Sequence, residues 1–155
     1  ATALGETLES TELTSGARQL VQTMRTNGAY TVLVSGGFNF FTNAIGKMVG
    51  FHEDRSNKLI IANDVLTGKV GDPILDSDAK LESLKSISVA KQVPIEETLA
   101  TGDGANDLPM ILAAGLGVAF HAKYAVEAKA PAAIRYGDLT ALLYIQGYQR
   151  EEFSE

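Results

Sequence analysis

The loop at residues 101–107, Thr-Gly-Asp-Gly-Ala-Asn-Asp, places two carboxylates, an amide side chain and two glycines within one short stretch. The apolar residues Thr98–Ala100 precede it, and a helical pattern with Pro109 in its first turn follows it. Open parallel sheets bind their ligands at such strand-to-helix turns. Asp103 and Asp107 are four residues apart, near enough to share one hard cation. Because oxygen ligands in an open turn suit Mg²⁺, we predict a magnesium site here.

Other interpretations of this loop depend on its glycines. Gly102, Gly104 and Asp107 have nearly the spacing of the dinucleotide pattern Gly-x-Gly-x-x-Gly. However, Asp107 replaces the third glycine, and Lys123 stands about where an acidic residue would bind the ribose. An EF-hand is disfavoured because alanines occupy two of its ligand positions, whereas a plain Asp- and Gly-rich surface turn remains an alternative. We expect the glycines to let the backbone bend sharply and approach a bound group.

A second strand-loop-helix pattern surrounds Ser35. The residues of Tyr30–Val34 are β-branched and aromatic, which predicts a fully buried strand. This strand leads into Ser35-Gly36-Gly37 and then into an amphipathic helix that continues to Val49. A serine hydroxyl beside glycine amides at a helix N-terminus is suited to hold an oxyanion. The alternative is that Ser35 only caps the helix.

Lys80 lies in the first turn of a further predicted helix, which opens at Asp76-Ser77-Asp78. A lysine there opposes the helix dipole, so helix stability does not explain it. We expect its charge to face a phosphate, with an ordinary solvated lysine as the alternative. Asp76 and Asp78 suit capping and dipole complementarity. His52 and His121 have no second histidine or cysteine at ligand spacing, so we assign them to structural or solvent-facing positions.

The elements that position these residues alternate along the chain. We predict helices at 15–27, through 41–49, opening at 76–80 and continuing through 87, and at 108–115, 123–129 and 139–146. We also predict strands at 30–34, 98–102, 116–120 and 132–134, and a hairpin at 58–70. This alternation indicates an α/β fold with a parallel sheet and right-handed crossovers. Residues 15–147 are predicted to form the core domain, residues 1–14 a linker or remnant, and residues 148–155 a flexible tail.

The overall composition narrows the classes of function. A length of 155 residues suits one domain, and a hydrophobic fraction of 45% supports a true core. The absence of cysteine excludes disulfides and thiolate zinc sites, and it fits a reducing compartment. The net charge of -6 argues against nucleic acid as a partner but allows a local anion site. No membrane span or signal peptide is evident, so we expect a cytoplasmic protein without a membrane partner.

Three segments in order, Val34–Phe38, Ala79-Lys80 and Gly102–Asp107, resemble the second, third and fourth motifs of the haloacid dehalogenase superfamily. More narrowly, they are similar to its phosphoserine phosphatase family, and the similarity extends from about Leu13 to Phe153. The resemblance implies a Rossmann-like parallel sheet with a β-hairpin insertion. It also implies Mg²⁺ as cofactor and hydrolysis of a small phosphorylated metabolite, O-phospho-L-serine, in serine biosynthesis.

The resemblance assigns a role to each site residue. Ser35 and the amide of Gly36 bind the transferred phosphoryl group. Lys80 neutralises that group and holds the carboxylate of the nucleophile, and Asn106 contacts the phosphate side. In the fourth motif, Asp103 is the Mg²⁺ ligand and Asp107 orients the metal site. These roles amount to positioning and electrostatic stabilisation of charge on the phosphoryl oxygens.

The first motif of the family, Asp-x-Asp followed by x and Thr or Val, is missing. It supplies the nucleophile and the general acid and base. The only Asp-x-Asp is Asp76-Ser77-Asp78, which directly precedes Ala79-Lys80, and we reject it. The helical cap that reads the serine part of the substrate is also mostly absent, with residues 1–14 as its last remnant. We therefore expect this chain alone to be inactive. The alternative is a truncated, non-catalytic phosphate- or Mg²⁺-binding regulatory module.

The missing motif also has a structural consequence. In this fold the first-motif strand lies between the second-motif and fourth-motif strands. Without it, the strands at Tyr30–Val34 and Thr98–Gly102 should each have an open edge. Unpaired buried backbone groups cost about 1–3 kcal/mol each. We expect a missing N-terminal segment, a swapped partner chain or a rearranged sheet to complete the fold.

Overall fold

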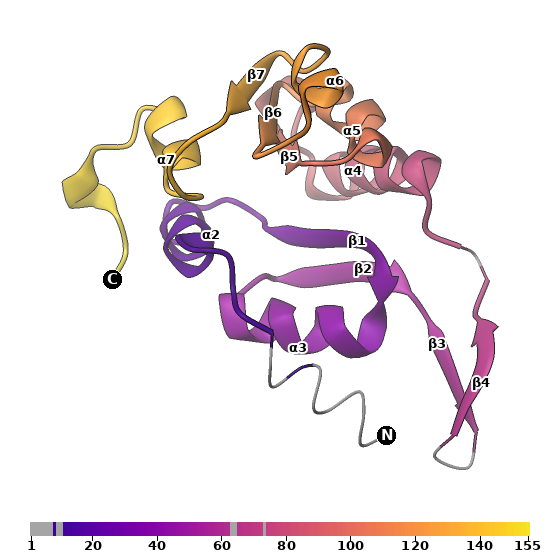
Figure 1. The fold of residues 1–155 in the computed structure, drawn as a ribbon. Coiled ribbons are helices and arrows are strands. Elements are labelled where there is room, and N and C mark those ends of the chain that lie inside the picture. The colour runs from indigo at the N-terminus through magenta and orange to yellow at the C-terminus, as the bar shows by residue number, and fades with distance from the viewer. Residues whose placement is uncertain (1–7, 9–10, 63–64, 73) are drawn as a thin grey trace. The chain divides into compact units, whose positions relative to one another are not determined.

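The computed structural model describes residues 8, 11–62, 65–72 and 74–155 (Figure 1). The chain divides into two compact units. The N-terminal unit comprises Ala1–Ile74 with Leu142–Glu155, and the central unit comprises Leu75–Ala141. Each unit contains helices and a parallel strand pair, which confirms the α/β prediction. Most of the predicted remnant at residues 1–14 lies outside the described residues.

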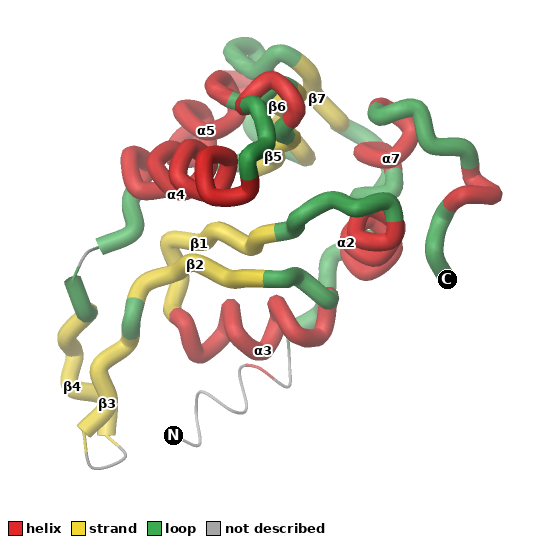
Figure 2. Tube along the Cα trace, turned by 180° about the vertical axis from the view of Figure 1, so that it is seen from behind, coloured by secondary structure: helices red, strands yellow, loops and turns green. Residues whose placement is uncertain are grey.

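The N-terminal unit is built on two parallel strands. Its first elements are α2 (Ala17–Thr26), β1 (Val32–Phe38), α3 (Asn39–Val49) and β2 (Glu53–Asn57). The crossover helix α3 packs on β1 and β2, which lie side by side (Figure 2). Next come β3 (Leu59–Ala62) and β4 (Val65–Val70), which pair antiparallel and confirm the predicted hairpin. The turn at Asn63-Asp64 lies outside the described residues.

Three predictions for the N-terminal unit were wrong in detail. The predicted strand continues through the glycines to Phe38, and Val32–Val34 are half-buried rather than fully buried. The strand β2 was not predicted. Gly16, with φ 80°, is the N-cap of α2, rather than Ser15 or Thr14, and no side chain caps the helix.

The C-terminal segment returns to the N-terminal unit. It contains α7 (Ala141–Ile145) and the 3₁₀ helix η3 (Arg150–Glu152). The backbone N–H of Ser154 donates to Thr23 Oγ1 at 2.8 Å, and Thr23 is fully buried in α2. Residues 148–155, predicted as a flexible tail, therefore contain a short helix and make a contact that the sequence did not predict.

The central unit is a three-stranded parallel sheet in the order β5-β6-β7. Its elements are α4 (Ser77–Lys91), η1 (Ile95–Glu97), β5 (Leu99–Gly102), η2 (Ala105–Asp107), α5 (Leu108–Ala113), β6 (Leu116–Phe120), α6 (Tyr124–Glu127) and β7 (Ala132–Ile134). The helix α5 packs on β5 and β6, and α4 packs on α5. Ile111 and Val118 are fully buried in this core.

Helix and strand boundaries in the central unit agree closely with the sequence. The strands at 116–120 and 132–134 lie where they were predicted. Asp76 is the N-cap of α4, and its side chain accepts a hydrogen bond from the Ala79 N–H at 2.9 Å, which confirms the capping assignment.

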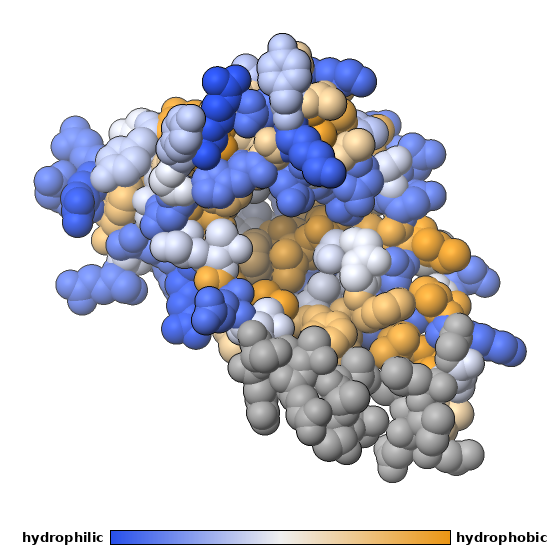
Figure 3. Space-filling model, in the orientation of Figure 1, coloured by the Kyte–Doolittle hydropathy of each residue, from blue (hydrophilic) through white to orange (hydrophobic). Residues whose placement is uncertain are grey.

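The face shown in Figure 3 is largely hydrophilic, with apolar residues between the polar ones. No helix in the described part of the chain has the length and apolar character needed to cross a membrane.

Two strands have one open edge each. Among the described residues, β1 pairs only with β2, and β5 pairs only with β6. These are the strands of the second and fourth motifs, and the open edges agree with the prediction for a fold without its first-motif strand.

Two glycines should respond in opposite ways to the same substitution. A Cβ at Gly46, inside α3, would meet Asp54 Cβ at an ordinary 3.7 Å, so Gly46→Ala should stabilise the protein by about 0.5–1 kcal/mol. A Cβ at Gly117 would overlap the carbonyl oxygen of Ile111, so Gly117→Ala should cost about 1–3 kcal/mol. Urea unfolding measures both, and shifts of the same sign would contradict this packing.

Candidate functional site

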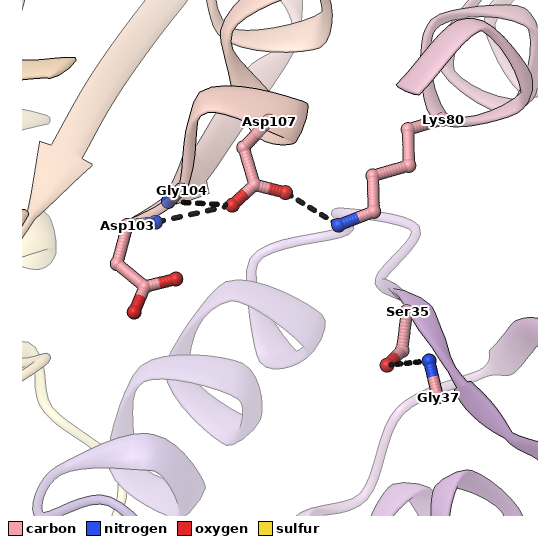
Figure 4. A network of polar contacts seen from close by, with 6 residues as sticks. All are labelled: Ser35, Gly37, Lys80, Asp103, Gly104 and Asp107. Atoms are coloured by element: carbon pink, nitrogen blue, oxygen red, sulfur yellow. Dashed lines mark hydrogen bonds and ion pairs between the residues drawn. The ribbon is translucent and has the colours of Figure 1, made fainter. Parts of the chain in front are cut away.

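A buried ion pair is the centre of the site in the central unit. Lys80 Nζ lies 2.6 Å from Asp107 Oδ1, and the two residues are only 6% and 7% exposed (Figure 4). Asp76 fixes the lysine locally, because it caps α4 and its carbonyl accepts from the Lys80 backbone N–H at 3.0 Å. Lys80 is therefore not the ordinary solvated lysine of the alternative interpretation.

The second carboxylate oxygen of Asp107 binds the backbone of its own loop, residues 101–107. Asp107 Oδ2 accepts from the backbone N–H of Gly104 at 3.0 Å and of Asp103 at 3.2 Å (Figure 4). Three donors thus converge on one carboxylate, one of them cationic. Because both oxygens of Asp107 are already hydrogen-bonded, the contacts favour a role in orienting the loop. They disfavour the sharing of one cation by Asp103 and Asp107, which the spacing of the two residues had suggested.

Gly102, in this loop, leaves space for the Asp107 side chain, and its backbone has no unusual φ angle. A Cβ at Gly102 would lie 2.6 Å from Asp107 Cβ and closer still to its carboxylate. The backbone bends at Asp103-Gly104, as expected, although neither Gly102 nor Gly104 has a positive φ. The Asp107 side chain also fills the space next to Gly102. A pyrophosphate therefore has no close approach to the backbone there, which disfavours the dinucleotide interpretation.

Asp103 and Asn106 are the exposed polar residues of the loop. The Asp103 carboxylate points away from the ion pair (Figure 4). Across the described residues, no three His, Cys, Asp or Glu side chains form a metal-binding group. Mg²⁺ is commonly held by one or two carboxylates with waters and substrate phosphate. Asp103 fits one such position and needs further oxygen ligands from elsewhere.

Ser35 and Gly36, the predicted phosphoryl-binding residues of the second motif, lie in the N-terminal unit. Ser35 lies within β1, and its Oγ accepts from the Gly37 N–H at 3.0 Å. The N-cap of α3 is Phe38, and no side chain caps this helix, so Ser35 is not the cap that the alternative required. Sequence reasoning missed Asn57, whose Nδ2 donates to the Gly36 carbonyl oxygen at 2.8 Å.

The histidines have local, structural contacts. His52 Nδ1 accepts from the Thr31 N–H at 3.1 Å, and its ring stacks on Tyr30 with the ring centroids 4.7 Å apart. His121 stacks on Phe120 with a centroid separation of 4.0 Å. These contacts agree with the structural assignment from the sequence.

The sequence matches the family model for haloacid dehalogenase-like hydrolases over residues 2–112. The chain therefore belongs to the haloacid dehalogenase-like hydrolase family.

Two similar curated proteins are both phosphoserine phosphatases. The chain is 43% identical over 140 residues to a phosphoserine phosphatase of Streptomyces coelicolor, covering 90% of this chain and 34% of that protein. It is 38% identical over 152 residues to phosphoserine phosphatase SerB2 of Mycobacterium tuberculosis, covering 98% and 37%. The chain thus spans about a third of the length of these relatives.

Solved structures agree with these relatives. An unliganded probable phosphoserine phosphatase from Vibrio cholerae superposes with a TM-score of 0.89 at 36% identity, covering 92% of this chain and 44% of that one. A phospho-aspartyl intermediate analogue of phosphoserine phosphatase superposes with a TM-score of 0.85 at 34% identity, covering 91% and 68%. The similarity confirms the resemblance and the fold predicted from the three motifs.

The two aspartates of the loop should differ sharply in their effect on stability. Asp107→Asn leaves the Lys80 ammonium buried without its counter-charge and should lower the free energy of unfolding by about 3–5 kcal/mol. Asp103→Asn, at an exposed position, should change it by less than about 0.5 kcal/mol. Urea unfolding followed by circular dichroism measures both values.

A second substitution serves as the control. In the Asp107→Asn background, Lys80→Met removes the unpaired charge and should recover part of the loss. Equal effects of the two aspartate variants, or no recovery with Lys80→Met, would show that the ion pair does not stabilise the loop.

Proposed function

We propose that this chain is part of a Mg²⁺-dependent phosphoserine phosphatase that hydrolyses O-phospho-L-serine to L-serine and phosphate, in serine biosynthesis in the cytoplasm. The buried Lys80–Asp107 pair, joined to the Asp103-Gly104 backbone, carries the proposal. It orders a lysine and an exposed carboxylate in the way that a phosphoryl-transfer site requires. The phosphoserine phosphatases that the chain resembles support the choice of substrate.

In this proposal the phosphoryl group is bound by residues of the second, third and fourth motifs. The Ser35 hydroxyl and the Gly36 amide donate to its oxygens, as Asn106 does from the loop. Lys80 supplies the positive charge. An ammonium group has three N–H donors, and the bond to Asp107 uses one of them. Donors fixed before the reaction stabilise developing charge without reorganising.

The metal and the nucleophile complete the proposal. Asp103 would hold Mg²⁺, which when bound neutralises charge on the phosphoryl oxygens. The printed sequence contains no Asp-x-Asp-x-Thr or Asp-x-Asp-x-Val, and Asp76 of its only Asp-x-Asp caps α4. In this proposal the nucleophilic aspartate would come from polypeptide outside this sequence, either an N-terminal segment or a partner chain. The open edges of β1 and β5 offer such a segment a place to pair.

Activity of the longer protein that contains this chain tests the proposal. With phosphoserine and Mg²⁺, Lys80→Ala and Asp103→Asn should each lower kcat at least about 100-fold, because each removes charge stabilisation. Lys85→Ala is a matched control on the same helix, since its side chain is 50% exposed and pairs only with Glu82 among the described contacts. Full activity of the Lys80 and Asp103 variants would refute the proposal.

The 155-residue chain alone should release no phosphate from phosphoserine, because it lacks the nucleophile. A phosphate-release assay of the pure chain with Mg²⁺ checks this, and measurable Mg²⁺-dependent turnover would contradict it. If the longer protein binds Mg²⁺ or phosphate but also lacks turnover, the non-catalytic regulatory module is the better description.

A further inference from the structure

Asn57 lies at the end of β2 and its side chain reaches the backbone of β1 next to Ser35. The residue pairs with Phe38 of β1 across the parallel ladder, and it is only 6% exposed. Its Nδ2 donates to the carbonyl oxygen of Gly36 at 2.8 Å. Asparagine is depleted in strands, and burying its amide is costly unless the amide is hydrogen-bonded. The residue type at position 57 therefore needs a reason beyond strand formation.

The Gly36 carbonyl and the Gly37 N–H belong to one peptide plane. Because the peptide group is planar, fixing the oxygen at one end also fixes the direction of the N–H at the other. Asn57 holds the oxygen, and Ser35 Oγ accepts from the Gly37 N–H at 3.0 Å. A short chain of bonds thus runs from the Asn57 side chain through this peptide to the Ser35 hydroxyl.

This stretch of β1 needs such a restraint. The ladder register between β1 and β2 shifts between Val34 and Phe38, so regular pairing is interrupted across the two glycines. Glycine also has more backbone freedom than any other residue. Without a side-chain restraint, the Gly36–Gly37 peptide could rotate and carry its N–H away from Ser35.

We propose that Asn57 is a positioning residue for phosphoryl binding, an inference that rests on the proposed function. By orienting the Gly36–Gly37 peptide, Asn57 makes Ser35 Oγ the acceptor of the Gly37 N–H. A hydroxyl that accepts in this direction has its own O–H left to donate. Asn57 thereby directs the Ser35 proton toward an incoming phosphoryl oxygen without touching the substrate itself.

Kinetics of the longer protein that contains this chain provide the first test. Asn57→Ala should lower kcat for phosphoserine about 10- to 100-fold and change KM much less, as expected for a misplaced donor. Asn57→Asp has the same size and cannot donate when ionised, so it should lower kcat similarly. Asn27→Ala is the matched control, since Asn27 Nδ2 also donates to a backbone carbonyl, that of Thr23, at 2.9 Å. It should leave kcat and KM unchanged.

A double variant separates positioning from general stability. If Asn57 acts through Ser35, Ser35→Ala combined with Asn57→Ala should be no slower than Ser35→Ala alone, within about three-fold. A purely structural role predicts that the two losses multiply. Multiplied losses, or Asn57 variants with wild-type kcat per folded molecule, would overturn the inference.

A readout independent of activity distinguishes this inference from the proposed function. The amide of Gly37 should exchange with solvent at least about ten-fold faster in Asn57→Ala than in the wild type or Asn27→Ala. If the wild type fails to hydrolyse phosphoserine while Gly37 exchange accelerates, the proposed function fails and the restraint by Asn57 stands. Unchanged exchange at Gly37 would disprove the restraint even in an active enzyme.

Discussion

The central unit depends on one buried ion pair, between Lys80 and Asp107. Removing two opposite charges from water costs several kcal/mol for each ion, and their attraction compensates only when the remaining hydrogen-bonding atoms are also paired. Asp107 meets that condition, because its two oxygens accept from the Lys80 ammonium and from two backbone amides. The helix α4 and the loop after β5 are thereby joined through buried side chains.

The ion pair also explains the sequence around it. Gly102 has no side chain because the Asp107 carboxylate occupies that space, and Asp76 caps α4 one turn before Lys80. These contacts give the carboxylates of Asp107 and Asp103 different surroundings. Asp107 is buried and supports the loop, whereas Asp103 is exposed and remains available to a cation. Two aspartates in one short loop therefore have different chemistry because their surroundings differ.

The sequence predicted most of what local chemistry determines. The Asp76 cap, the strands of the central unit and the hairpin follow from capping and hydrophobic patterns, which act between near neighbours. The strand β2 could not be predicted in this way, because Glu53–Asn57 is entirely polar and no alternation distinguishes it from a loop. The contact from Asn57 to Gly36 was missed for the same reason, since it joins residues 21 positions apart through that strand. The need for glycine at position 102 was also missed, because it depends on the Asp107 side chain packing against Gly102. The spacing of residues in the sequence does not reveal that contact.

In the proposed enzyme, the open edges of β1 and β5 would link stability to catalysis. An unpaired buried backbone group costs about 1–3 kcal/mol, and a domain has only about 5–15 kcal/mol of net stability, so a few such groups matter. In the proposed enzyme, further polypeptide would pair with these edges and would carry the nucleophilic aspartate. Ser35 lies within β1 and Asp103 directly follows β5, and open parallel sheets bind their ligands at the carboxyl ends of their strands. The polypeptide that satisfies the open edges would therefore also supply the nucleophile.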